Sequence, residues 1–95
     1  MKTRAYILNV PPHKTEVLEM LEWEGHLTSK RFKRIIDELF FWAANSIIYR
    51  DLKAVIKKDG KEIMTINCKT ISDGSAISAH LTKNGRAIRT MTIAA

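Results

Sequence analysis

The chain has 95 residues, of which 45% are apolar, and a formal net charge of +6. This length holds one hydrophobic core, no apolar run approaches the ~20 residues that cross a bilayer, and the N-terminus lacks the pattern of a signal peptide, so we expect a single cytoplasmic domain over residues 1–95. The single cysteine, Cys68, excludes an internal disulfide, while the positive charge favours an anionic partner such as nucleic acid or an acidic protein surface.

The N-terminal quarter of the chain predicts a strand and a short helix. Residues 4–10 form a β-favouring run, which a pair of prolines ends. Thr15 suits the N-cap of a helix over residues 16–23, with glutamates in its first turn, and Gly25 is a natural stop for it. One face of the strand would carry Tyr6, Leu8 and Val10.

The longest predicted element is a helix from residue 30 to residue 50 or 52, capped by Thr28 and Ser29. Two i,i+4 ion pairs, Lys33 with Asp37 and Arg34 with Glu38, would mark its solvated face. Apolar residues at spacings of three and four predict a wide core-facing stripe. That stripe consists of Phe32, Ile35, Ile36, Leu39, Phe40, Ala43 and Ile47.

Two hairpins should follow, because Asp59-Gly60 and Asn84-Gly85 suit the type I′ turn, in which both central residues need positive φ. Residues 72–75 would join the two hairpins. Two-residue turns predict four opposed pairs, Val55 with Met64, Lys57 with Glu62, Leu81 with Ile88 and His80 with Arg89.

These elements predict an α+β fold in the order β-α-α-β-β-β-β. An antiparallel sheet of two hairpins plus an N-terminal strand would carry one long helix packed on one face. Whether the N-terminal strand lies at an edge or between the hairpins stays open at this point.

The strongest functional signal is a group of four cations at the start of the long helix. The positive end of the helix dipole disfavours cations there, and local rules of this kind tend to be broken at functional sites. Because free N–H groups at a helix start already bind anions, we expect a site for phosphate or clustered carboxylates; a solvated basic end is the alternative. Two more cations flank the second hairpin turn, so the predicted anion-binding residues are Lys30, Arg31, Lys33, Arg34, Lys83, Arg86 and Arg89.

The outward sheet face should be polar and mildly basic, and it carries no aromatic residue. Base stacking on that face, as RNA-recognition sheets do it, is therefore not expected. The outward residues would be Thr65, Asn67, Lys69, Ser78, His80, Thr82 and Arg89.

The long helix also carries more apolar residues than its core stripe needs. A helix that is apolar nearly all round is buried on more than one side, either by other parts of the chain or by a second chain. The predicted protein interface, for a homodimer or a partner protein, consists of Phe41, Trp42, Ile48 and Tyr49.

Catalytic signals are lacking: the three histidines are scattered, the glycines are isolated, and no serine or cysteine has a base at a recognisable spacing. We therefore expect no enzyme, metal, cofactor or small-molecule substrate. The leading interpretation is a small accessory protein that binds nucleic acid or a nucleoprotein complex through its basic helix start and hairpin tip. The alternative is a protein-binding inhibitor or adaptor, of the type phages and plasmids use, acting through an apolar helix face and a sheet edge. An enzyme subunit completed by another chain ranks last.

Overall fold

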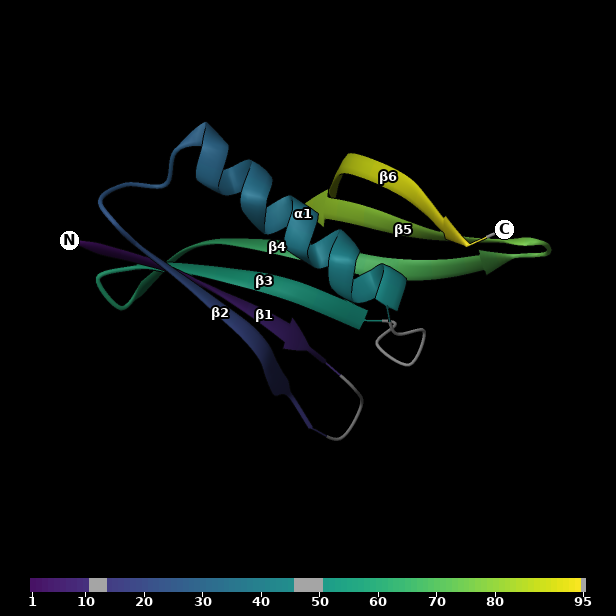
Figure 1. Cartoon of the computed structure of the whole chain (residues 1–95), viewed down its shortest axis with the longest axis horizontal. Helices are drawn as coiled ribbons and strands as arrows, with labels where there is room; N and C mark the ends of the chain where they lie inside the picture. Colours follow the sequence, from purple (N-terminus) through teal and green to yellow (C-terminus); the bar gives the residue numbers. More distant parts are fainter. Residues whose placement is uncertain (11–13, 46–50, 95) are drawn as a thin grey trace.

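A computed structural model describes residues 1–10, 14–45 and 51–94, which form one antiparallel sheet and one helix (Figure 1). The elements follow in the order β1 Lys2–Asn9, β2 Glu16–Glu24, α1 Ser29–Asn45, β3 Asp51–Lys58, β4 Lys61–Asp73, β5 Ala76–Lys83 and β6 Arg86–Ala94. The predicted α+β class, with a helix packed on one face of an antiparallel sheet, is confirmed.

The predicted short helix over residues 16–23 is wrong, because this segment is strand β2. Its residues pair with β1 along almost their whole length, from Lys2 opposite Glu24 to Asn9 opposite Glu16. Leu21 faces the helix side of the sheet, but a bulge near the start of the strand interrupts the period-two pattern that identifies strands. Sheet pairing therefore overrides the helix propensity of a segment rich in glutamate and leucine.

The sheet has the strand order β2-β1-β3-β4-β5-β6, so the N-terminal strand lies inside it, between β2 and β3. The two predicted hairpins are also joined to each other, because β4 and β5 pair antiparallel around the turn at Gly74 and Ser75. Strands β3 to β6 thus form one continuous meander, and β1 and β2 add a third hairpin at its side (Figure 1).

Both predicted type I′ turns are confirmed by positive φ at their central residues, with values of 50° and 80° at Asp59-Gly60 and 52° and 77° at Asn84-Gly85. Lys57 lies opposite Glu62, as predicted. The other three predicted pairs are wrong by one residue, because a bulge follows each turn on the returning strand. The observed pairs are Ile56 with Met64, Leu81 with Arg89 and His80 with Thr90.

The second bulge changes the face on which Arg89 lies. Arg89 is the register partner of Leu81, which is fully buried beneath α1. Opposed residues in a sheet share a face, so Arg89 lies on the helix side and its predicted outward position is wrong. The other predicted outward residues, from Thr65 to Thr82, alternate with buried ones and lie on the face opposite α1. Tyr6 lies on this face as well, because it pairs with Val55, which pairs with Thr65, so the prediction of an outward face without an aromatic residue is wrong.

The helix begins as predicted, because the Thr28 side-chain oxygen accepts a hydrogen bond of 3.2 Å from the Arg31 backbone N–H. Its described part ends at Asn45, while Leu52 is buried in β3, so the predicted extension to residue 52 is wrong. Ile47 lies outside the described residues.

The core lies between α1 and the inward side chains of β1, β3, β4 and β5. The helix contributes most of its predicted stripe, Ile35, Ile36, Leu39, Phe40 and Ala43. On the sheet side, Cys68 is buried, and burial raises the pKa of its thiol to about 11, so it is an unreactive thiol at neutral pH. Among the described residues, no helix has the length and apolar content needed to cross a membrane.

Candidate anion-binding surface

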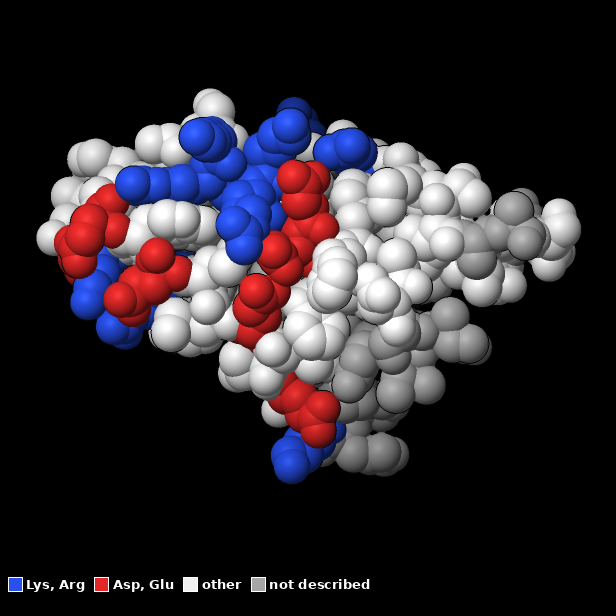
Figure 2. Space-filling view, viewed as in Figure 1, with Lys and Arg blue, Asp and Glu red and all other residues white. Residues whose placement is uncertain are grey.

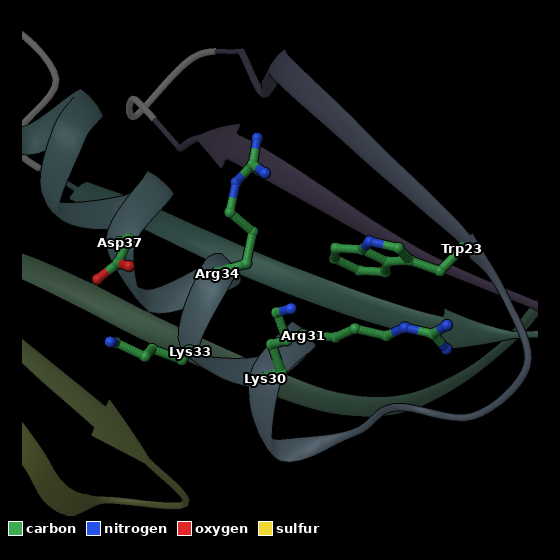
Figure 3. Close-up of a pocket in the computed structure, with 6 residues that line it drawn as sticks. All are labelled: Trp23, Lys30, Arg31, Lys33, Arg34 and Asp37. Atoms are coloured by element: carbon green, nitrogen blue, oxygen red, sulfur yellow. The ribbon is translucent and has the colours of Figure 1, made fainter.

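The four cations at the start of α1 line one hollow of about 520 Å³ (Figure 3). Trp23 from β2 forms part of its wall, and Asp37 lies one turn further along the helix. The hollow therefore joins two elements and brings an aromatic ring next to a group of cations. Its cationic residues are the predicted ones, Lys30, Arg31, Lys33 and Arg34.

Trp23 owes its place to the strand that the sequence did not predict. It is the register partner of Thr3, whose side chain is fully buried on the helix side of the sheet. Thr3 donates its hydroxyl hydrogen to the carbonyl of Gly25, which fixes the chain just after β2. The alternation of Leu21 and Trp23 with charged residues is the signal that could have found this position.

Arg31 is held in place by its surroundings. One guanidinium nitrogen donates to the backbone carbonyl of His26, and the guanidinium carbon lies 6.0 Å from the centroid of the Trp23 ring. Cation–π contact of this kind is weakly stabilising at a solvated site. Arg31 thus ties the start of α1 to the loop before it and to β2.

The remaining three cations are exposed, and they differ in their partners. Arg34 forms the predicted ion pair with Glu38, at 3.0 Å. The predicted pair of Lys33 with Asp37 is not formed, and neither Lys30 nor Lys33 has an ion pair among the described residues. Two lysines at the helix start therefore have their charge available to a ligand.

The cations of the β5–β6 turn lie on the other flank of α1. Lys83 lines a second hollow, of about 320 Å³, together with residues just before and within the first turn of the helix. It lies opposite Arg86 in the register, as the turn predicts. Arg89 reaches over the Phe40 ring of α1, with 5.3 Å between the guanidinium carbon and the ring centroid. The fold thus brings the two predicted basic groups to the same helix.

We refer to these residues together as the basic surface: Lys30, Arg31, Lys33, Arg34, Lys83, Arg86 and Arg89. Figure 2 shows lysine and arginine side chains gathered along one border of the molecule, over the start of α1 and towards β6. In the described part of the chain, no carboxylate forms an ion pair with Lys83, Arg86 or Arg89. Like charges that face one another without counter-ions favour an anionic ligand.

Two of the four residues of the predicted protein interface, Phe41 and Trp42, lie on the described part of α1. Phe41 is 54% exposed and meets Trp42 edge-on. Trp42 itself is half-buried, and its indole N–H donates a hydrogen bond of 3.0 Å to Glu19 of β2. Strand β2 therefore covers part of the face that the sequence assigned to a partner. Ile48 and Tyr49 lie outside the described residues.

The contact between α1 and β2 contains two neighbouring carboxyl groups. The neighbouring Glu19 carboxyl raises the pKa of Glu38, and partial burial acts in the same direction. Arg34 opposes this by favouring the ionised form. The raised pKa of Glu38 means that ionisation of this group disfavours the contact between the helix and the strand.

Glu19→Gln should therefore stabilise the protein at neutral pH. The amide keeps an acceptor for the Trp42 indole and gives Glu38 a donor instead of a second anion. Because the pKa of Glu38 is raised in the folded state, its favourable contribution is complete at low pH and is lost as the pH rises through that pKa. Urea unfolding should show a gain at pH 7 that disappears near about pH 4. Glu16→Gln, at an exposed position, is the control; equal gains at both pH values would contradict the explanation.

Within residues 1–10, 14–45 and 51–94, no three His, Cys, Asp or Glu side chains gather where they could hold a metal ion.

Comparisons of this chain with protein-family models, with curated proteins and with solved structures found no match, so its function has to be inferred from its own residues.

Proposed function

We propose that this protein is a non-enzymatic accessory protein that binds nucleic acid, alone or in a nucleoprotein complex, through the basic surface. The observation that carries the proposal is the meeting of two cation groups from distant parts of the sequence on the two flanks of α1. Five of their members, Lys30, Lys33, Lys83, Arg86 and Arg89, have no ion pair within the described residues.

Phosphate groups suit this surface because they are regularly spaced anions that several separate cations can contact at once. Contacts of this kind supply affinity and fix the position of a protein on the backbone, but they read little sequence. An accessory protein that coats or positions nucleic acid needs no more than that. A bound nucleic acid would also relieve the repulsion between Lys83 and Arg86 across the β5–β6 turn.

A protein-binding inhibitor or adaptor is the second candidate. It is favoured by exposed apolar side chains, Phe41 on α1 and, on the face of the edge strand β2 opposite α1, Val17 and Met20. A partner that adds a strand to β2 would use the backbone groups of that edge together with the side chains of Val17 and Met20. Binding of that type depends little on salt.

Salt dependence separates the two functions. Fluorescence anisotropy with a labelled oligonucleotide should show binding at low salt, and the logarithm of the association constant should fall linearly with the logarithm of the salt concentration. About five phosphate contacts predict a slope between about −3 and −5. No binding at low salt, or a slope near zero, would contradict nucleic-acid binding and favour the protein-binding alternative.

A further inference from the structure

Trp23 distinguishes the hollow at the start of α1 from a plain cluster of cations. Its indole is half-buried on β2 and forms a wall of the cavity, next to Lys30, Arg31 and Arg34. Figure 3 shows the ring projecting from the strand towards the start of the helix, with the Arg31 side chain extending alongside it. In the described part of the chain, no group accepts a hydrogen bond from its indole N–H.

The ring is also held in a fixed environment before any ligand arrives. Arg31 is anchored to the carbonyl of His26 and lies over the ring, 6.0 Å from its centroid. The strand partner of Trp23 is the buried Thr3, so its backbone is fixed in the sheet. A fixed aromatic ring loses little conformational entropy when a flat ligand stacks on it.

A hollow with these walls suits a ligand that is both anionic and flat. Lys30, Lys33 and Arg34 offer positive charge to any anion, including a protein carboxylate. The indole adds a π surface that only a flat ring system uses fully, and a nucleotide unit combines such a ring with a phosphate. In a duplex the bases are paired and stacked on one another, so only an unpaired base has a free face.

We infer that Trp23 stacks on an unpaired base while the neighbouring cations contact its phosphates, so that the nucleic acid bound by the basic surface is single-stranded. This inference rests on the proposed function and adds the class of nucleic acid to it. Stacking on aromatic residues tolerates all bases, so the preference is for strand state rather than for sequence.

The direct test compares three labelled oligonucleotides of equal length: a single strand, the same backbone without bases, and a duplex. Wild-type protein should prefer the single strand to the abasic strand. Trp23→Leu should weaken binding to the single strand by about 5- to 150-fold, the range expected for the loss of one stacked base. Binding to the abasic strand and the duplex should stay within about twofold. Trp23→Phe should restore most of the lost affinity, because a phenyl ring still stacks.

A second measurement does not depend on how well the Trp23→Leu variant folds. The chain has two tryptophans, so Trp42→Phe leaves Trp23 as the only one. Its fluorescence should be quenched by the single strand and hardly changed by the abasic strand at equal saturation.

The outcomes separate the inference from the proposed function. If wild-type protein binds the single and abasic strands equally and Trp23 fluorescence does not respond, stacking is wrong while binding through the basic surface stands. A preference for the duplex over the single strand would also overturn the inference. If none of the three oligonucleotides binds at low salt, the proposed function itself fails.

Discussion

Replacing both Lys30 and Lys33 with glutamate should leave the fold intact and weaken nucleic-acid binding by about 100-fold or more. Both side chains are exposed and have no ion pair among the described residues, so the substitutions break no ion pair there. A carboxylate at position 30 suits the first helical turn by about 0.3–1 kcal/mol. Repulsion between the new carboxylate at position 33 and Asp37, at i,i+4 spacing, offsets this by about 0.2–0.5 kcal/mol. Stability should therefore change little, whereas two attractions for phosphate become repulsions.

The double variant should be measured for unfolding by urea and for binding across a salt series. The slope of log affinity against log salt should become shallower by about 1.4 for a single strand, because two contacts are lost. The matched control is Lys53→Glu with Lys69→Glu, which changes the net charge equally on the face opposite α1. Equal losses in both double variants would mean that net charge alone governs binding, and the basic surface would not be the site.

Phe40→Ala should destabilise the protein by about 3–5 kcal/mol, because its ring is buried in the core between α1 and the sheet and the truncation leaves a cavity. Only 4% of Phe40 is exposed, and its outer side is covered by Arg89. A loss of this size is a large part of the stability of a domain of 95 residues.

The neighbouring residue provides the control for this prediction. Phe41→Ala removes the same ring from a position that is 54% exposed, and we expect it to cost less than about 1 kcal/mol. Equilibrium unfolding in urea measures both variants under identical conditions. Similar losses at positions 40 and 41 would contradict the assignment of the core face of α1.

The parts of the fold that the sequence predicts correctly are those with local signals. The cap at Thr28, the apolar stripe of α1 and the two type I′ turns each depend on residues within a few positions of one another. Strand β2 has only a short local signal, the alternation of Leu21 and Trp23 with charged residues, because a bulge interrupts that pattern and pairing with β1 decides the strand state. The bulges after the turns are equally hidden, since an extra residue such as Ile88 is defined only by the strand opposite it.

The candidate site likewise has residues that the sequence identifies and an arrangement that only the strand pairing determines. The cations at the start of α1 and around the β5–β6 turn are visible in the sequence, but their meeting depends on the strand order. The helix predicted over residues 16–23 does not place Trp23 beside these cations, whereas strand β2 does. The sequence predicts the wrong face for Arg89, because a single bulge reverses the side on which this residue lies.

The interior position of β1 has a consequence for the way the chain folds. The ladders β1-β2, β3-β4, β4-β5 and β5-β6 each join strands that are neighbours in the sequence, so they close short loops and should form early. The ladder between β1 and β3, by contrast, joins Thr3 to Lys58 and Asn9 to Leu52 across the whole of α1. Closing that long loop costs more chain entropy than any hairpin. We expect the docking of the N-terminal hairpin onto β3 to limit the folding rate, so that the hollow beside Trp23 is completed only in this last step.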